Sequence, residues 1–299
     1  MRFRTLTVGL LVGGLTLAAC GGTPSNSGTG APPTTTESIS VASGVSVPGS
    51  ATFDRIRRNG TITVGVKDDQ PGIGIKDPIT GEYSGFDIEI AKLVAAKLGL
   101  STDRIKFTPI QSAAREAALG NGQVDLVVAS YTINDKRKAQ VSFAGPYFVA
   151  GQSLLVRKDD NSITGKNTLK GKKVCSVTGS TPIQRVRDQG LTEPSNIVEL
   201  SKYSDCVNQL EQHSVDVLTT DDAILKGYAA LEPDKLKVVG QPFSTEPYGI
   251  GLAHDDAALR GKIDDILQQA LNDGTWQRLY NKTLGQSGVT TTKPVLQRY

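Results

Sequence analysis

The residues best suited to chemistry lie in YTINDKR, residues 131–137, which follows the run GQVDLVVAS. Hydroxyl groups at Ser130 and Thr132 and the guanidinium of Arg137 could together grip a carboxylate, with the Arg fork taking both oxygens. The run before them, residues 124–129, is short, apolar and β-branched, which is typical of a buried parallel strand. Ligands of open α/β sheets bind outside the carboxyl ends of such strands. An ordinary strand-to-helix loop with a surface arginine is the alternative for this segment alone.

A second segment repeats the helix–turn–strand pattern 91 positions later. The matched positions are Leu119, Val124, Asp125 and Leu126 in the first copy, and Leu210, Val215, Asp216 and Val217 in the second. The same offset pairs Ser130 with Asp221 in DVLTTDDAI. Two facing units, one with hydroxyls and an arginine and one with a carboxylate, would suit a zwitterion. Because such patterns are common, coincidence is the alternative.

The segment VTGSTP, residues 177–182, offers a further anion site. It follows a predicted strand, residues 173–177, and begins a predicted helix in which Pro182 suits the first turn. Free backbone amides at Ser180 and Thr181 could hold a ligand carboxylate. A plain helix N-cap explains the same residues, and the two interpretations are compatible.

Strands and helices must bring these groups to one edge. Residues 61–66 are β-branched and alternating, which predicts a strand ending at Lys67. Residues 86–98 predict a helix with Asp87 in its first turn, where an acid suits the helix dipole. We therefore interpret Asp87 as a helix-start acid and not as a catalytic one.

Two strands are expected to cross between lobes. Residues 153–156 leave the first lobe and EPYGIGL returns to it. Gly249 and Gly251 would permit torsion changes at this hinge. A final helix over residues 258–284 is expected to rejoin the first lobe, with its tryptophan in the core.

Length and charge are those of an ordinary globular protein. The chain has 299 residues, 38% hydrophobic and 21% charged, which is enough for two domains. The net charge is +3, and Arg2 and Arg4 contribute two of these charges to a predicted signal segment. The remainder is near neutral, which argues against nucleic-acid binding.

The first 20 residues predict a lipoprotein signal peptide. A basic start precedes an apolar core too short to span a membrane, and LAAC ends at Cys20. Cleavage before Cys20 and lipidation of its thiol would anchor the protein; a plain secretory signal is the alternative. Residues 21–50 contain 22 Gly, Ser, Thr or Pro residues, which predicts a disordered tether.

The two remaining cysteines, Cys175 and Cys206, form an even pair within the predicted second lobe. In an exported protein such a pair is typical of a disulfide, with two buried free thiols as the alternative.

Signatures of catalysis and of cofactor binding are missing from the sequence. There is no HxxH or CxxC spacing for a metal, no GxSxG, no GxGxxG opening a helix, and no P-loop. We therefore expect no enzyme activity, no metal and no cofactor.

Seven motifs occur in order over about residues 53–285: GFDIEIAKLVAAKLG (85–99), the VDL strand, YTINDKR, FAGPY (143–147), VTGSTP, DVLTTDDAIL (216–225) and EPYGIGL. This series resembles the solute-binding proteins of polar amino-acid ABC transporters (bacterial extracellular solute-binding protein family 3). Within that family the chain is most similar to glutamate-binding lipoproteins of Gram-positive bacteria.

The resemblance implies a two-lobed α/β periplasmic-binding-protein fold of type II, with two crossover strands as its hinge. The expected organisation is a signal peptide (1–20), a tether (21–50), lobe 1 (51–154 and 246–285), lobe 2 (155–245) and a loose tail (286–299).

The resemblance also implies roles for the binding residues. Arg137, with Thr132 and the amide of Thr181, should hold the α-carboxylate of an amino acid. Asp221, helped by Ser130, should hold the α-ammonium.

Lys67 stands where family members for neutral or basic ligands have Asp, which points to glutamate or aspartate as the ligand. Gln70 is a weaker candidate for the same pocket. A solvated lysine is the alternative for Lys67, and glutamine or asparagine are alternative ligands.

The implied protein is a lipid-anchored monomer on the extracytoplasmic face of the cell membrane that delivers its amino acid to an ABC permease. Two alternatives stay open: a ligand-sensing module for a membrane receptor, and an enzyme like the cyclohexadienyl dehydratases of this fold family.

Overall fold

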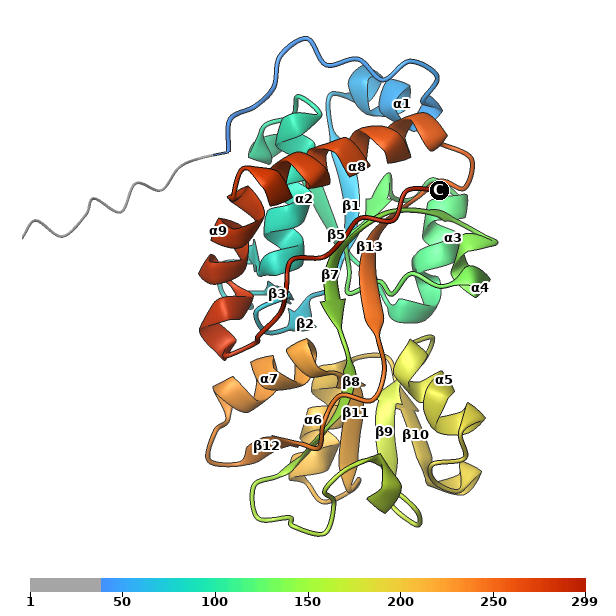
Figure 1. The fold of residues 1–299 in the computed structure, drawn as a ribbon, viewed down its shortest axis with the longest axis vertical. Coiled ribbons are helices and arrows are strands. Elements are labelled where there is room, and N and C mark those ends of the chain that lie inside the picture. The colour runs from blue at the N-terminus through green and yellow to red at the C-terminus, as the bar shows by residue number, and fades with distance from the viewer. Residues whose placement is uncertain (1–38) are drawn as a thin grey trace, which may run out of the picture. The chain divides into compact units, whose positions relative to one another are not determined.

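The computed structural model describes residues 39–299, which form two α/β lobes connected by two crossings of the chain (Figure 1). The predicted two-lobed α/β fold is confirmed. The lipidation site predicted at Cys20 and the signal peptide lie outside the described residues.

The sheet of the first lobe has the strand order β5-β1-β6-β13-β7. Strand β1 is parallel to β5 and β6, whereas β13 is antiparallel to β6 and β7. Its strands are β1 (Ile62–Val66), β5 (Ile105–Pro109), β6 (Leu126–Val127), β7 (Ser142–Ala150) and β13 (Glu246–Leu252). A small antiparallel sheet beside it contains β2 (Asp69–Gln70), β3 (Gly74–Lys76) and β4 (Tyr83–Ser84).

The sheet of the second lobe has the order β10-β9-β11-β8-β12. Strand β9 is parallel to β10 and β11, and β8 is antiparallel to β11 and β12. Its strands are β8 (Gln152–Arg157), β9 (Val174–Val177), β10 (Ile197–Leu200), β11 (Val217–Asp221) and β12 (Leu236–Val239).

The 91-residue repeat of the sequence recurs as matching structure in the two lobes. Asp125 accepts a hydrogen bond from the amide of Thr63 at the start of β1 (2.8 Å). Asp216 accepts one from the amide of Lys173 at the start of β9 (2.7 Å). Each aspartate therefore fixes a parallel pair, β1 with β6 and β9 with β11, so that the polar ends of β6 and β11 correspond.

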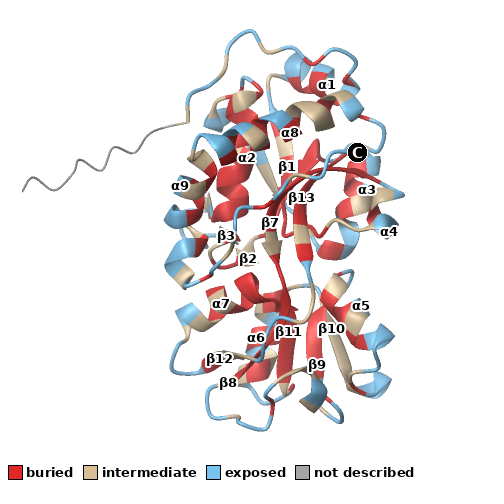
Figure 2. Ribbon diagram, viewed as in Figure 1, coloured by how far each residue is buried: buried red, intermediate tan, exposed pale blue. Residues whose placement is uncertain are grey.

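Helices cover both sheets, and the strands are mostly buried (Figure 2). The α-helices are α1 (Ala51–Asn59), α2 (Phe86–Lys97), α3 (Arg115–Gly120), α4 (Asp135–Lys138), α5 (Thr181–Asp188), α6 (Tyr203–Glu211), α7 (Asp222–Leu231), α8 (Ala257–Asn272) and α9 (Thr275–Lys282). Short 3-10 turns are Thr102–Arg104, Ser112–Ala114, Lys166–Thr168, Pro194–Asn196 and Leu284–Ser287.

The C-terminal helical segment is broken, where the sequence predicted one helix over residues 258–284. Gly274 has a φ of 81°, a left-handed conformation that ends the run between α8 and α9. The break lets Trp276 turn into the core, where it is 1% exposed and donates from Nε1 to the carbonyl of Tyr147. Its predicted core position is confirmed.

The predicted disulfide is present. Cys175 on β9 is bonded to Cys206 on α6, with their Cα atoms 5.7 Å apart. The bond fastens the first turns of α6 to the sheet of the second lobe.

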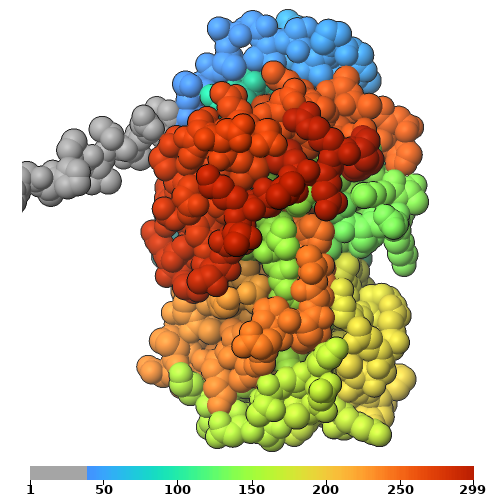
Figure 3. Space-filling view, viewed as in Figure 1, coloured from blue at the N-terminus to red at the C-terminus, as the bar shows by residue number. Residues whose placement is uncertain are grey.

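The ends of the described chain are more ordered than the sequence indicated. Part of the expected tether lies against the first lobe: the amide of Ala42 donates to the carbonyl of Ala96, and Val47 is 6% exposed. The expected loose tail crosses the face of the same lobe (Figure 3), where the amide of Gln297 bonds to the carbonyl of Gly145 and the amide of Phe143 donates to the Tyr299 hydroxyl.

The chain crosses between the sheets at Gly151 and again before β13. Gly249 and Gly251, expected to supply torsional freedom, lie in close packing: a Cβ atom at Gly249 would lie 2.7 Å from Ile133, and one at Gly251 would lie 2.8 Å from Tyr131. At Gly151 a Cβ atom would lie 2.7 Å from Pro242, so the two crossing segments touch there.

Candidate functional site

Polar side chains from both lobes meet at the carboxyl ends of parallel strands, as expected for an open α/β sheet. They line one cavity: Ser112, Arg115, Ser130, Thr132, Arg137, Ser180, Thr181, Pro182, Tyr203 and Asp221. Six of the eight predicted ligand residues are among them, while Lys67 and Gln70 are not.

Arg137 sits at the junction of the two lobes. Its Nη1 donates to the carbonyl of Thr132 (2.6 Å), its Nη2 to the carbonyl of Gly179 in the other lobe (3.0 Å), and its Nε pairs with Glu116 (3.2 Å). The residue is 6% exposed. A carboxylate that took the terminal nitrogens would replace carbonyl acceptors with a charged one, which makes stronger hydrogen bonds.

Arg115 also lines the cavity, although sequence reasoning missed it. It is 2% exposed, and its Nε and Nη1 donate to the carbonyls of Ser112, Ala129 and Ser130. Within residues 39–299, Nη2 of Arg115 donates no hydrogen bond, whereas Nε and Nη1 do. Burial and the nearby charge of Arg137 lower the pKa of Arg115 to about 10. An anion in the cavity would relieve this repulsion.

Lys67 lies one layer behind the cavity at the end of β1. Its Nζ donates to the carbonyl of Ile110 (3.1 Å) and to Oγ of Ser112 (2.8 Å), and Ser112 lines the cavity. Burial, then the charge of Arg115, lower the pKa of Lys67 to about 7. The ammonium is therefore placed to orient the Ser112 hydroxyl.

Gln70 is fully buried, and neither its amide nitrogen nor its oxygen has a hydrogen-bond partner in the described structure. An unsatisfied buried amide is costly. Its unpartnered amide on β2 keeps it a candidate for hydrogen bonding to a ligand.

On the second lobe, α5 begins at the cavity. Ser180 caps the helix by accepting from the amide of Ile183 (3.4 Å). Thr181 is the first helical residue, so its amide is one of those that a helix leaves without an internal partner. Both predicted roles, cap and anion site, fit this geometry.

Asp221 ends β11 and faces the cavity as a buried carboxylate. Its Oδ2 accepts from the Tyr248 hydroxyl (2.6 Å), whereas Oδ1 is buried without a partner within the described part of the chain. Burial, then the charge of Glu246, raise the pKa of Asp221 to about 8. A ligand ammonium against Oδ1 would satisfy the orphaned oxygen and stabilise the ionised form.

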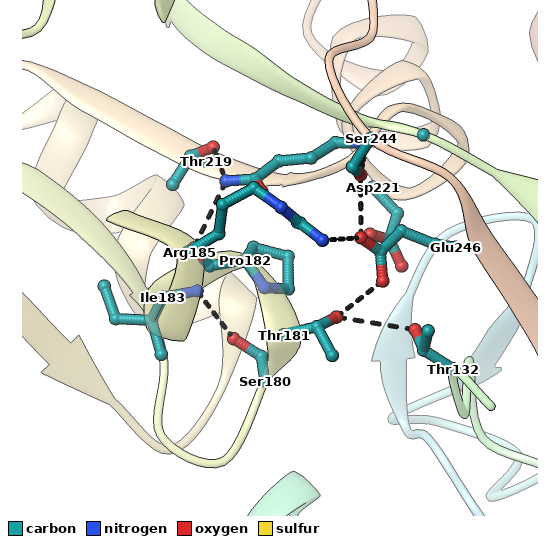
Figure 4. Close-up of polar contacts among 12 residues, drawn as sticks. Thr132, Ser180, Thr181, Pro182, Ile183, Arg185, Thr219, Asp221, Ser244 and Glu246 are labelled. Carbon is teal, nitrogen blue, oxygen red and sulfur yellow. Dashed lines mark hydrogen bonds and ion pairs between the residues drawn. The ribbon is translucent and has the colours of Figure 1, made fainter. Parts of the chain in front are cut away.

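Glu246, at the start of β13, anchors the second-lobe side of the site. It is fully buried and accepts from Thr181 Oγ1 (2.7 Å), from Ser244 Oγ (2.7 Å) and from Arg185 (2.8 Å), as Figure 4 shows. The Thr181 hydroxyl therefore points back to the returning strand and lies 3.5 Å from Thr132 Oγ1.

The lobes touch at a second place, where Asp69 of the first lobe meets α6 of the second. Its Oδ2 accepts from the amides of Tyr203 (2.8 Å) and Ser204 (3.2 Å). Helix α6 has no side-chain cap of its own. A carboxylate from the opposite lobe thus caps the helix and suits its dipole.

We expect Asp69→Ala to weaken ligand binding about fivefold, because a helix cap contributes about 1 kcal/mol and this one requires the lobes to be together. Calorimetric titration with the preferred amino acid measures the effect. Lys202→Met is the matched control, since it removes only the half-exposed ion pair with Asp68. Equal effects of both changes would contradict a specific role for the cap.

No group of three or more His, Cys, Asp or Glu residues that could hold a metal ion occurs among the described residues. Likewise, none of the helices within residues 39–299 is long and apolar enough to cross a membrane.

Comparison with known proteins assigns the family. The model of the bacterial extracellular solute-binding proteins, family 3, matches residues 62–286, and the chain belongs to that family. Glutamate-binding protein GluB of Corynebacterium glutamicum is 40% identical over 241 residues, covering 77% of this chain and 81% of that protein. The ABC transporter glutamine-binding protein of Bacillus subtilis is 38% identical, covering 77% and 84%.

Solved structures agree with this assignment. An ancestral arginine-binding protein bound to glutamine is 37% identical, covers 76% of this chain and 98% of its own, and has a TM-score of 0.69. These relatives are binding proteins, which confirms a solute-binding protein over an enzyme.

Proposed function

We propose that the protein captures glutamate or aspartate outside the cytoplasm and presents it to an ABC permease. The observation that carries this proposal is the charge of the cavity lining. The first lobe supplies two guanidinium groups, Arg115 and Arg137, and the second supplies Asp221 with an unpartnered oxygen. An acidic amino acid brings two carboxylates and one ammonium, so each charge has a counterpart.

The α-carboxylate is assigned to Arg137, with the Thr132 hydroxyl and the amide of Thr181. The α-ammonium is assigned to Asp221, with Ser130. These groups come from opposite lobes, so a ligand that engages them all stabilises the closed arrangement.

The side-chain carboxylate is assigned to Arg115, whose Nη2 is available, with Lys67 contributing through Ser112. A ligand such as arginine would place a third guanidinium beside two others, which like-charge repulsion disfavours. The glutamate-binding relative supports an acidic ligand, and the glutamine-binding relative makes glutamine the natural competitor.

Membrane attachment is part of the proposal. The LAAC sequence supports lipidation of Cys20, and two or more acyl chains would anchor the protein stably. Cell fractionation tests the anchor, since Cys20→Ser should move the protein out of the membrane fraction.

A thermal-shift screen of the twenty amino acids tests the function. A ligand at 100 times its dissociation constant adds about 2.7 kcal/mol of apparent stability, so the strongest ligand should be clear. Glutamate or aspartate is expected to give the largest shift. A larger shift with glutamine or arginine would overturn the acidic ligand, and no shift with any amino acid would overturn amino-acid binding.

A further inference from the structure

Ser130 holds an unusual backbone conformation at the cavity. Its φ is 42°, in the left-handed region that side chains with a Cβ atom rarely adopt. Within residues 39–299 it shares a positive φ with only one other non-glycine residue, His213. Such conformations persist when the surroundings enforce them, and they gather at functional sites.

Asp87 is one of the groups that enforces it. Its Oδ2 accepts from the backbone amide of Ser130 at 2.7 Å, and its Oδ1 accepts from the Tyr147 hydroxyl at 2.7 Å. The carboxylate is completely buried, so both oxygens are used as acceptors and neither is left to solvent.

The opposite side of the same residue is held by Arg115, whose Nη1 donates to the carbonyls of Ala129 and Ser130 at 3.1 and 3.3 Å. The residue that lines the ligand cavity is thus clamped from its amide by an anion and from its carbonyl by a cation. A helix-start acid would need neither contact, since interaction with the dipole alone would let its side chain face solvent.

We propose that Asp87 is a positioning residue for ligand binding: it holds Ser130 in the left-handed conformation that presents this residue to the cavity. Asp87 does not line the cavity, so it acts through Ser130. Burial raises the pKa of Asp87 to about 6, while hydrogen bonds from Tyr147 and Ser130 and the charges of Lys67 and Arg115 favour the ionised form. The inference rests on the proposed amino-acid site.

The test is a double-mutant cycle on affinity for glutamate and glutamine, measured by calorimetry. Asp87→Ala should weaken binding about 10- to 100-fold. Ser130→Gly loses the hydroxyl but adopts a positive φ without help. When Asp87→Ala is added to the Ser130→Gly variant, it should therefore cost no more than about threefold.

Asp87→Asn keeps the test decisive if Asp87→Ala does not fold. Its amide oxygen can still accept from Ser130 and its NH₂ can donate to the Tyr147 oxygen, so affinity should stay within about fivefold of wild type. Tyr147→Phe is the matched control, because it removes the second hydrogen bond of Asp87 and leaves Ser130 held.

Hydrogen exchange of residues 128–133 in the ligand-free protein gives a readout that needs no ligand. Exchange should accelerate in Asp87→Ala and stay unchanged in Asp87→Asn. The proposal would be overturned if the losses from Asp87→Ala and Ser130→Gly multiply in the double mutant. It would also be overturned if Asp87→Asn binds as weakly as Asp87→Ala while its exchange stays unchanged. Failure of the wild type to bind any amino acid overturns the proposed function instead.

Discussion

Asp221→Asn is expected to weaken amino-acid binding by about 150-fold or more, because removing one partner of a buried charge pair costs about 3–5 kcal/mol. The ammonium of the ligand would lose the only unpartnered carboxylate oxygen that the described residues place in the cavity. Calorimetric titration with glutamate measures the loss. Near-native affinity would remove Asp221 from the ammonium site.

The same substitution should not lower the stability of the ligand-free protein. Burial and Glu246 raise the pKa of Asp221 from 3.8 to about 8. A carboxyl group whose pKa rises on folding binds more protons in the folded state, so the wild type loses stability relative to the variant as the pH rises towards 8. Melting temperatures of both proteins at pH 5 and pH 8 should therefore diverge in favour of the variant.

Asp222→Asn is the matched control for this prediction. It removes the same charge one residue away, where the carboxylate pairs with Lys226 (2.8 Å) and accepts from the amide of Gly151 (3.1 Å). Asn retains an acceptor for that amide, so binding should change only a few-fold. A loss as large as that of Asp221→Asn would mean that affinity follows the net charge of the lobe and not contact with the ammonium.

Local patterns predicted most of the fold because they are enforced by local physics. The helix expected over residues 86–98 is α2 with Leu98 as its C-cap, and EPYGIGL is β13. The failures are places where tertiary contacts decide. Gly274 breaks the last helix so that Trp276 can reach the core, and the tail is held by backbone partners that no local pattern reveals.

The site was predictable where a polar residue lies at or just beyond the end of a strand, as Asp221 does on β11 and Ser130 does after β6. Arg115 was missed because a basic residue at the start of a short helix is usually solvated. For two other lining residues, Ser112 and Tyr203, the 91-residue offset offers a signal, because it pairs them with each other and both line the cavity. Glu246 was missed because its role depends on Arg185, which approaches from a helix of the other lobe.

Sequence and geometry differ on which cation binds the side-chain carboxylate of the ligand. The sequence favours Lys67, whose Nζ is bonded to Ile110 and Ser112, whereas Arg115 itself lines the cavity. A charge-assisted hydrogen bond contributes about 1.5–3 kcal/mol, or about 10- to 150-fold in affinity. We expect Arg115→Met to lower the ratio of glutamate affinity to glutamine affinity by that factor, in addition to a loss shared by both ligands, because Arg115 also holds the Ser130 carbonyl. Lys67→Met should have a smaller effect on that ratio.

The pH dependence of the wild type distinguishes the two cations without any mutation. The pKa of Lys67 is lowered to about 7 and that of Arg115 to about 10. If Lys67 selected the acidic ligand, the preference for glutamate over glutamine would fall as the pH rises from 6 through 8.5, because the ammonium loses its proton. Selection by Arg115 leaves this ratio constant over the same range, since the guanidinium stays charged. Competitive titrations of both ligands at pH 6, 7 and 8.5 decide between them, and we expect the constant ratio; a declining ratio that Lys67→Met abolishes would return the role to Lys67.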